Sequence, residues 1–434
     1  MTYREACEYI AELQGQGIRP GLETIRGLCA RLGNPQDGLS FVHIAGTNGK
    51  GSVLAFVSTA LKAAGYRCGR FFSPSLREYR ERIQINNRMI SQADFARLLA
   101  RVKEAAEGMA AAGLAGPTAF EADVALALLY FAERGCDVVV LEAGLGGRDD
   151  ATNIVENTLA AVLAPIGLDH SEWLGEELAE IAAHKADIIK SGAAVVCAAG
   201  TEEVLAVVRA KAGQCGCPMQ VSPLERVRRV KAAKPDGKAL VFRQRFSYGG
   251  LADVEISLAG RHQIDNAVLA IDTLRALAEQ GFKISEKQLR RGLREAVWPG
   301  RFQLLRANPY FIIDGAHNPA AATVLAAAIK FYFTGRQIVY IIGVLADKDY
   351  RGIIAATHEL AAHIVTVTPP AARGLPAYEL AQAAAAYHLR VTAADSVHEA
   401  CELAVLLAGK DGVVIAFGSL AYLGGIIHDR QKKG

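Results

Sequence analysis

The sequence has few cysteines, and they are scattered. Eight cysteines occur in 434 residues, and only Cys215 and Cys217 lie close together, with no second pair at zinc-site spacing. This scatter argues against a structural zinc site and a disulfide framework, so we expect reduced thiols and place this pair in an exposed loop. The first ten residues carry charges where a signal peptide needs an apolar run, which predicts a cytoplasmic protein.

The sequence also lacks a charge excess and a long apolar run. Lys and Arg number 48 against 45 Asp and Glu, for a formal net charge of +3. This balance does not indicate a nucleic-acid or membrane partner, and it favours a small-molecule partner. The Ala-rich run from Pro319 ends at Lys330, too short for a bilayer span, so no transmembrane helix is expected. The basic run 226–231 is interpreted as a solvated strand face, with an acidic substrate tail as the alternative.

Strand-like and helix-like segments alternate along most of the chain. Apolar residues at 41–45 precede a helical pattern at 52–64, and an apolar helix at 119–134 precedes a strand at 137–143. Such alternation is typical of an α/β fold with a mainly parallel sheet. A hydrophobic fraction of 51% in 434 residues can fill the cores of two or three domains.

A change of pattern suggests where the domains divide. Residues 227–256 alternate like a β-hairpin around Pro235-Asp236-Gly237, and we interpret them as a peripheral extension of the first domain. After Trp298-Pro299-Gly300 a second α/β series begins. We therefore predict domains at 1–297 and 298–434. The second should contain strands at 310–313, 338–342, 364–368 and 413–417.

The sharpest local pattern is a strand that enters a glycine-rich turn and then a helix, at residues 43–52. Glycines let backbone amides close on phosphate oxygens, while Lys50 supplies a cation and Ser52 a hydroxyl. A tight turn with an exposed lysine would explain less of this order. Gly51 separates Lys50 from Ser52, and Ile44 replaces the first glycine of the common phosphate-loop spacing, which disfavours a generic kinase or GTPase.

Phosphates that meet an attacking carboxylate require divalent cations, which oxygen ligands hold best. Ser73 and Glu142 meet that need chemically, and Glu142 lies near the carboxyl end of a predicted strand, where parallel sheets bind ligands. The alternative for Glu142 is an ion pair with Arg148.

An ordered set of motifs resembles the Mur-ligase superfamily and, within it, the folylpolyglutamate synthase and dihydrofolate synthase family. The resemblance covers nearly the whole chain and implies a P-loop-containing, mainly parallel sheet domain followed by a smaller Rossmann-like α/β domain. Besides the loop GTNGKGS, the motifs lie at residues 17–22, 32–36, 73–76, 81–82, 145–153, 168–170, 298–301, 314–319 and 418–420. One departure is Ser75, where the family usually has histidine, which leaves affinity or specificity on the pterin side less secure.

The resemblance implies a metal centre. Ser73, Glu142 and His170 match the family's ligands for two Mg²⁺ ions, and the family also allows a monovalent cation. On chemistry alone His170 would be read as structural, because Mg²⁺ prefers oxygen. Lys185 matches a lysine that the family carbamylates, which is sensible because a desolvated neutral amine can capture CO₂. Lys50, His170 and Lys185 are thus the expected catalytic residues.

The resemblance also assigns the substrate contacts. Without it, these residues would be ordinary caps and surface charges, and His317 only the start of a helix. We expect ATP at Thr47, Asn48, Gly49, Lys50, Gly51, Ser52, Asn266, Arg301 and Asp314, L-glutamate at His317 and Ser419, and the folate side at Arg82.

The implied reaction is ATP-dependent addition of L-glutamate to a folate, or to dihydropteroate, through an acyl phosphate, by a monomer. The acceptor stays open between these two. One alternative is a Mur-type ligase for another carboxylate, although only about forty residues precede the loop, too few for a UDP-sugar domain. A P-loop switch ATPase would leave residues 314–319 unexplained. A dinucleotide oxidoreductase would lack the full glycine fingerprint at residues 144–147.

Overall fold

The computed structural model describes residues 1–233, 235 and 240–432. The chain divides into two compact units. Unit 1 comprises Met1–Ser75, Tyr79–Val227 and Asp265–Ala296, and unit 2 comprises Leu76–Glu78, Arg228–Ile264 and Val297–Gly434. Each unit is organised around its own sheet.

Unit 1 contains an eight-stranded sheet in the order β4-β3-β2-β5-β1-β6-β7-β8. The strands from β2 to β8 along this order pair in parallel, while β3 and β4 add an antiparallel margin. The mainly parallel sheet predicted from the sequence is thus confirmed. The strands are β1 Phe41–Ala45, β2 Cys68–Phe71, β3 Ile83–Ile85, β4 Arg88–Met89, β5 Val138–Glu142, β6 Thr158–Leu163, β7 Ala194–Cys197 and β8 Met219–Val221.

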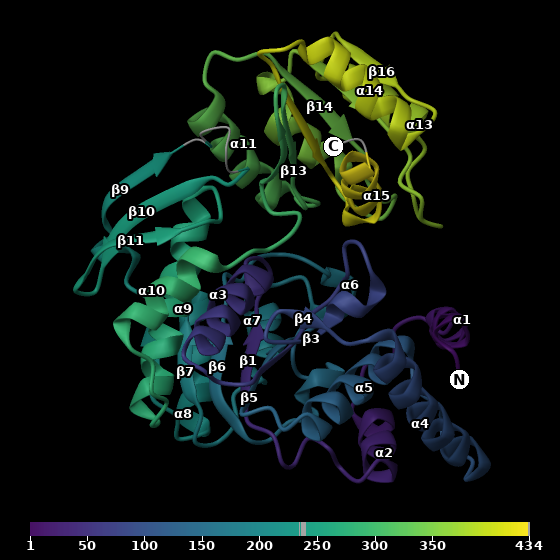
Figure 1. Cartoon of the computed structure of the whole chain (residues 1–434), viewed down its shortest axis with the longest axis vertical. Coiled ribbons are helices and arrows are strands. Elements are labelled where there is room, and N and C mark those ends of the chain that lie inside the picture. Colours follow the sequence, from purple (N-terminus) through teal and green to yellow (C-terminus); the bar gives the residue numbers. More distant parts are fainter. Residues whose placement is uncertain (234, 236–239, 433–434) are drawn as a thin grey trace. The chain divides into compact units, whose positions relative to one another are not determined.

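Two helices of unit 1 carry the predicted patterns. Helix α5, Ala119–Glu133, is apolar and buried along most of its length, and Thr118 and Glu121 form a capping box at its start. Helix α3, Lys50–Ala63, begins two residues earlier than predicted, because Gly49 adopts a left-handed conformation and takes the N-cap position. The other helices of this part of the chain are α1 Tyr3–Gln14, α2 Glu23–Arg31, α4 Gln92–Ala111, α6 Ser171–Leu174, α7 Leu178–Ala186, α8 Glu202–Gln214, α9 Arg261–Glu279 and α10 Glu286–Glu295 (Figure 1).

Close packing fixes α3 in place. A Cβ atom on Gly292 of α10 would overlap the backbone of Ala60, so only glycine allows these two helices to approach so closely. On its other side α3 lies against β2 and β5. The helix that starts at the glycine-rich loop is therefore held along its whole length.

Unit 2 contains a six-stranded sheet in the order β12-β13-β17-β14-β15-β16, parallel except for β12. The four predicted strands are confirmed, three with the predicted bounds and the third shifted to residues 363–366. The strands are β12 Gln303–Ala307, β13 Tyr310–Ile313, β14 Ile338–Ile342, β15 His363–Thr366, β16 Val391–Ala393 and β17 Val413–Phe417. The helices are α11 Pro319–Phe333, α12 Tyr350–Thr357, α13 Ala377–Ala385, α14 Val397–Ala408 and α15 Leu420–Lys432.

A three-stranded antiparallel sheet formed by β9 Arg228–Ala233, β10 Arg243–Tyr248 and β11 Leu251–Ile256 also belongs to unit 2. We had expected this segment to extend the first domain. It groups with unit 2 because Phe242 enters that core, with its ring centroid 4.8 Å from that of Tyr332. Asp236 and Gly237 of the expected turn lie outside the described residues.

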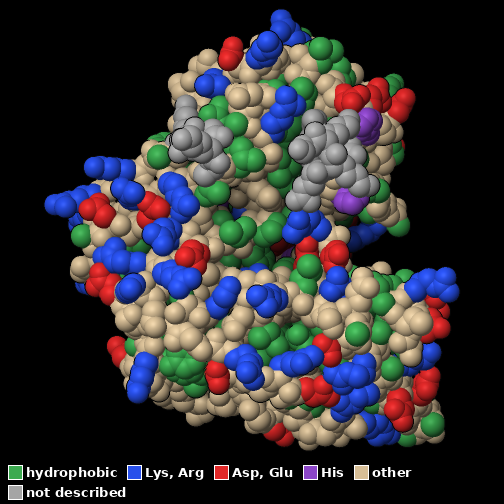
Figure 2. All heavy atoms as spheres, in the orientation of Figure 1, with side chains coloured by type: hydrophobic (Ala, Val, Ile, Leu, Met, Phe, Trp, Pro, Cys, Tyr) green, Lys and Arg blue, Asp and Glu red, His purple; other side chains and the backbone are tan. Residues whose placement is uncertain are grey.

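Two smaller expectations concern surfaces. The basic run is exposed along β9, and Figure 2 shows Lys and Arg side chains gathered over this small sheet. Cys215 and Cys217 lie in the loop between α8 and β8 as expected, but they are half-buried against an apolar cluster rather than exposed. Across the described ranges, no helix combines the length and apolar character that a membrane crossing requires.

Candidate active site

The predicted site residues of unit 1 follow four neighbouring strands. In the order β2, β5, β1 and β6, the carboxyl ends lead to Ser73, to Glu142, to the glycine-rich loop and to His170. Carboxyl ends of adjacent parallel strands lie at one edge of the sheet, where such folds bind ligands. We call this edge, with the loop 46–52, the catalytic edge.

The loop is held tightly from beneath. Backbone amides of Thr47 and Asn48 donate to the carbonyl of Pro165 at 2.9 and 3.2 Å, and the Thr47 hydroxyl donates to the carbonyl of Gly167 at 2.8 Å. A Cβ atom on Gly49, which has φ +86°, would overlap the amide oxygen of Asn266. The structure thus places Asn266 against the loop as expected, and it shows that Thr47 and Asn48 anchor the loop to the segment after β6.

Two lysine side chains converge on one backbone oxygen. The Nζ of Lys50 donates to the carbonyl of Gly46 at 2.9 Å, and the Nζ of Lys185 donates to the same carbonyl at 3.2 Å. Lys185 is only 4% exposed. Burial first, and then the positive charge of Lys50, lower the pKa of Lys185 to about 7. A substantial fraction of Lys185 is therefore a neutral amine at neutral pH.

Lys185 reaches this position because α7 packs against the glycine turn that follows β5. A Cβ atom on Gly147 would lie 2.6 Å from the carbonyl oxygen of His184, and the amide of Arg148 donates to that same carbonyl at 2.8 Å. The side chain of Arg148 pairs with Asp187 at 2.5 Å. The alternative in which Arg148 explains Glu142 is therefore not what the structure shows.

Glu142 and His170 differ in their surroundings. Glu142 is buried at the end of β5, opposite Ile44 of β1 in the strand register. The His170 side chain is 40% exposed, with its Nε2 3.8 Å from a carboxylate oxygen of Asp169. Its backbone is left-handed, with φ +53°, at the start of α6. The histidine side chain is thus partly exposed rather than buried in the core.

A buried polar chain behind the loop was not singled out from the sequence. The carboxylate of Asp150 accepts hydrogen bonds from the amide of Leu145 at 2.6 Å and from the hydroxyl of Thr152 at 2.5 Å. Because that hydroxyl donates to Asp150, it accepts from the Nε2–H of His43 at 2.9 Å. Burial lowers the pKa of His43 to about 3, which keeps it neutral. The available signal was Asp150 two residues before Thr152, a spacing typical of a side-chain cap.

Asp169 was also missed, although it stands beside His170 in a recognised motif. Its negative charge, like that of Asp150, opposes the lowering of the Lys185 pKa. The motif at residues 168–170 was the available signal, but we assigned a role only to its histidine.

The predicted ligands suit Mg²⁺ only when Lys185 is carbamylated. Among the described residues no cluster of three or more His, Cys, Asp and Glu side chains is arranged for a metal ion. The predicted set adds a hydroxyl from Ser73 and, if Lys185 is carbamylated, a second carboxylate-like group beside Glu142. An unmodified, protonated Lys185 would instead repel a cation. The fit therefore depends on the state of Lys185.

Arg82 is occupied by an internal ion pair. Its guanidinium lies 2.6 Å from the carboxylate of Asp123, which also accepts from the Tyr79 hydroxyl at 2.6 Å. The guanidinium stacks over the Tyr79 ring at 4.3 Å. Burial raises the pKa of Asp123, which Arg82 opposes. The structure thus gives Arg82 a structural role beside its predicted folate contact.

Unit 2 gathers its predicted residues at the carboxyl ends of β13 and β17, which are adjacent strands. The buried Asp314 carboxylate accepts from the amides of Phe302 and Ala316, each at 2.8 Å. Burial raises its pKa, and nearby Arg301 opposes the rise. His317 donates from Nδ1–H to the carbonyl of Gly315 at 2.8 Å. The Ser419 hydroxyl accepts from the amide of Ala421 at 3.2 Å at the start of α15.

Comparison with known proteins covers both units. The chain matches the Mur ligase middle domain over residues 44–274 and the Mur ligase glutamate ligase domain over residues 300–420. The dihydrofolate synthase/folylpolyglutamate synthase of Bacillus subtilis is 38% identical over 362 residues, covering 83% of this chain and 84% of that protein.

Solved structures agree. A Mycobacterium tuberculosis folylpolyglutamate synthase complexed with ADP and AMPPCP matches with a TM-score of 0.89 and 30% identity, covering 99% of both chains. Escherichia coli FolC in complex with DHPP and ADP matches with a TM-score of 0.86 and 29% identity, covering 100% of this chain and 98% of that one.

Proposed function

The chain belongs to the folylpolyglutamate synthase and dihydrofolate synthase family of Mur ligases, and from that premise we propose that it joins L-glutamate to a folate or to dihydropteroate with hydrolysis of ATP to ADP and phosphate. The observation that carries the proposal is the convergence of Lys50 and Lys185 on the Gly46 carbonyl, at the loop that starts α3. The Lys50 cation at a helix N-terminus suits a triphosphate, and the amine of Lys185 lies beside it, where the modification proposed below would bring a metal ion. Family membership also removes the support for a switch ATPase or an oxidoreductase.

A carboxylate and an amine do not condense in water, so the carboxylate must first gain a leaving group. In the proposed reaction a carboxylate oxygen of the acceptor attacks the γ-phosphorus of ATP, and the bond to ADP breaks. The amine of glutamate then attacks the carbonyl carbon and expels phosphate, which retains one oxygen of the acceptor. Lys50 holds its positive charge beside the phosphates throughout both steps.

Lys185 is proposed to act as a carbamate. The neutral amine that its lowered pKa provides attacks CO₂, forms a C–N bond and releases a proton. With Ser73, Glu142 and His170, the resulting carbamate would hold the two Mg²⁺ ions that the family implies. When bound, these ions neutralise charge on the phosphates. The hydrogen bonds of Asp150 to Leu145 and Thr152 hold the turn after β5 in place. Because α7 packs against this turn, they also position Lys185.

The remaining assignments rest on the resemblance and on local geometry. We propose that Asn266, Arg301 and Asp314 contact the nucleotide, that His317 and Ser419 bind glutamate, and that Arg82 supports the folate side. The hydrogen bond from its Nδ1–H to the Gly315 carbonyl orients the imidazole of His317, a group that can hydrogen-bond to glutamate. We further propose a monomeric, cytoplasmic enzyme, with a monovalent cation allowed by the family. The acceptor is either a reduced folate or dihydropteroate, or both.

A phosphate-release assay tests the function. Purified protein is incubated with ATP, Mg²⁺ and L-glutamate, with dihydropteroate or tetrahydrofolate as the acceptor. The mass of the product is measured by mass spectrometry. The proposal requires release that depends on both glutamate and one of these acceptors, with a product heavier by one glutamate residue. Release without an acceptor would favour the switch ATPase. Release only with a different carboxylate would favour another Mur-type ligase.

A further inference from the structure

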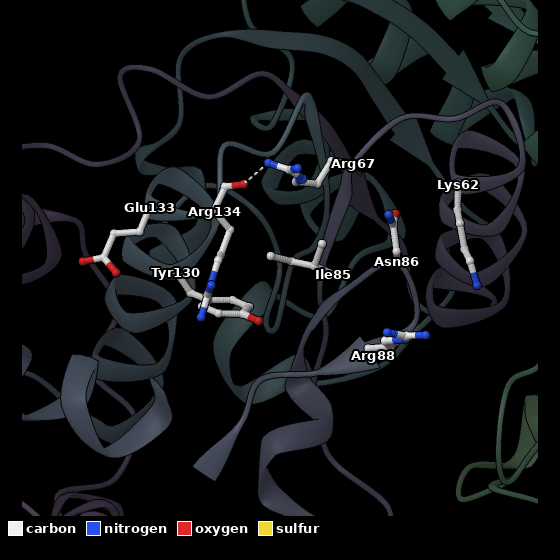
Figure 3. Close-up of a pocket in the computed structure, with 8 residues that line it drawn as sticks. All are labelled: Lys62, Arg67, Ile85, Asn86, Arg88, Tyr130, Glu133 and Arg134. Carbon is white, nitrogen blue, oxygen red and sulfur yellow. Dashed lines mark hydrogen bonds between the residues drawn. The ribbon is translucent and has the colours of Figure 1, made fainter. Parts of the chain in front are cut away.

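A cavity lies in unit 1, away from the catalytic edge. It encloses about 710 Å³ and is lined by Lys62, Arg67, Ile85, Asn86, Arg88, Tyr130, Glu133 and Arg134 (Figure 3). We call it the basic pocket. Helix α3 begins with Lys50 at the phosphate loop and carries Lys62 in its last turn, ~18 Å further along the axis. Strand β2 likewise starts beside Arg67 and ends toward Ser73. The basic pocket is therefore at the opposite end of the elements that support catalysis.

The charges around the basic pocket do not cancel. Four of the lining side chains are cationic and one, Glu133, is acidic. Glu133 points away from the other labelled side chains in Figure 3, and it pairs with Arg97 at 2.8 Å and with Arg101. The cation Arg134 is paired with Asp94 at 2.5 Å. Within the described part of the chain, neither Lys62 nor Arg88 takes part in an ion pair, so their charges face the pocket uncompensated by acids.

The walls provide shape as well as charge. The guanidinium of Arg67 donates to the carbonyl of Arg134 at 2.6 Å, which fixes one cation on the rim, as the dashed line in Figure 3 shows. Asn86 accepts from the amide of Cys68 at 3.0 Å, which fixes the turn between β3 and β4. Tyr130 is 8% exposed and lies 5.5 Å from the guanidinium of Arg134. Tyr130 and Ile85 give the pocket an apolar wall.

An opposing field must be considered, because α3 and α5 both end here. A helix carboxyl end carries roughly −0.5 charge, so two ends contribute roughly −1. The formal charge of the lining groups is +4 from Lys62, Arg67, Arg88 and Arg134 and −1 from Glu133, hence +3. The helix ends thus reduce the positive potential of the pocket without reversing it. A volume of about 710 Å³ lies within the usual range for small-molecule sites.

We propose that the basic pocket binds a small oligoanion, one that carries at least two phosphate or carboxylate groups beside an apolar body. Guanidinium forks bind both kinds of oxyanion, and Lys62 adds a point charge that suits either. The apolar body would lie against Tyr130 and Ile85. This site is separate from the proposed reaction, since none of its residues takes part in nucleotide, folate or glutamate binding as assigned above.

The test compares the full chain with a charge-reversed double variant, Lys62→Glu with Arg88→Glu. Inorganic tripolyphosphate and γ-linked triglutamate are titrated calorimetrically, in low salt and without Mg²⁺. The matched control is Lys287→Glu, an exposed lysine of α10 in the same unit. Binding of MgADP by all proteins checks that the phosphate loop is intact. If the double variant does not fold, Arg88→Gln replaces it.

The proposal predicts that the natural chain and Lys287→Glu bind at least one probe equally, whereas the double variant binds it about tenfold more weakly or worse. Added salt should weaken this binding, because the cations are exposed. The stronger probe identifies the group as phosphate or carboxylate. Equal affinity of all three proteins would place the probe outside the basic pocket, for example on the phosphate loop, and would overturn the proposal. If neither probe binds at millimolar concentration, the proposal is also overturned.

Discussion

The catalytic edge of unit 1 and the corresponding edge of unit 2 are built on the same principle with opposite electrostatics. In both, loops follow the carboxyl ends of neighbouring parallel strands. In unit 1 two lysine side chains crowd one carbonyl, and the buried Lys185 has a pKa lowered to about 7. In unit 2 a buried carboxylate, Asp314, accepts two backbone amides and so fixes the loop that carries His317.

This difference indicates which step of the reaction each unit serves. Unit 1 holds Lys185 in an environment that disfavours its positive charge, an arrangement that polyphosphate and a modification of Lys185 would relieve. Unit 2 balances its buried Asp314 carboxylate internally, with two backbone amides and the nearby Arg301. We therefore expect substitutions in unit 1 to affect chemistry and those in unit 2 to affect amino-acid affinity.

Lys50→Ala should produce the largest effect. Ligation should fall by about 10²–10³-fold or more, because the cation beside the phosphates is lost. Thermal unfolding should be nearly unchanged, since removing Lys50 also removes a repulsive charge next to Lys185. Glutamate incorporation and calorimetric unfolding are measured on the same preparation, and near-normal incorporation would contradict the phosphate-loop assignment.

Lys185→Ala should lose most activity for a different reason. The carbamate would be absent, and short carboxylic acids in solution should restore part of the rate by filling its place. Lys185→Arg should not recover, because arginine keeps its charge and does not take up CO₂. In the natural chain, bicarbonate should stimulate activity more strongly below pH 7, where protons compete with CO₂ for the amine.

Labelled bicarbonate gives the control for this prediction. A ¹³C carbamate signal should be present in the natural protein and absent from Lys185→Ala. An active, metal-loaded natural protein without that signal would refute the modification.

Glu142→Gln should shift the magnesium requirement more than the folate requirement. The substitution removes one negative charge at the end of β5 and keeps the size of the side chain. Activity is titrated with Mg²⁺ at several folate concentrations. We expect the half-saturating Mg²⁺ concentration to rise by about tenfold. An unchanged magnesium requirement would make Glu142 structural.

His317→Ala and Ser419→Ala should have the smallest effect, a rise of about tenfold in the glutamate KM with little change in MgADP affinity. Ser419 also caps α15, so its loss should cost about 1 kcal/mol in unfolding free energy. Ser396→Ala is the matched control, because Ser396 caps α14 by accepting from the amide of Glu399. The control should lose similar stability and keep its glutamate KM. Loss of nucleotide affinity alone would contradict the assignment.

Strand positions and the loop were predictable because they depend on local pattern. Residues 310–313, 338–342 and 413–417 are continuous apolar runs, and residues 41–45 are apolar except for His43, as expected for strands buried on both faces. The placement of residues 228–264 was not predictable, because it depends on which core the side chains of this segment, such as Phe242 and Ala259, join in space. Sequence periodicity does not encode such a choice.

The features of the site also fall into those that the sequence predicted and those that it did not. The loop and Asn266 were located through spacing and resemblance, whereas the chain from His43 through Thr152 to Asp150 depends on contacts across more than a hundred residues. The shared Gly46 carbonyl could not be foreseen either, because it requires α7 and the start of α3 to converge in space. The proposed carbamate on Lys185 was suggested by the family resemblance, and the lowered pKa of Lys185 adds a physical reason for it.

Oxygen transfer tests the acyl-phosphate reaction most directly. The acceptor is synthesised with ¹⁸O in both oxygens of the reacting carboxylate and is incubated with ATP, Mg²⁺ and L-glutamate in unlabelled water. The account predicts one ¹⁸O atom in each inorganic phosphate released and one left in the new amide carbonyl. Inorganic phosphate without ¹⁸O, alongside normal amide formation, would contradict it.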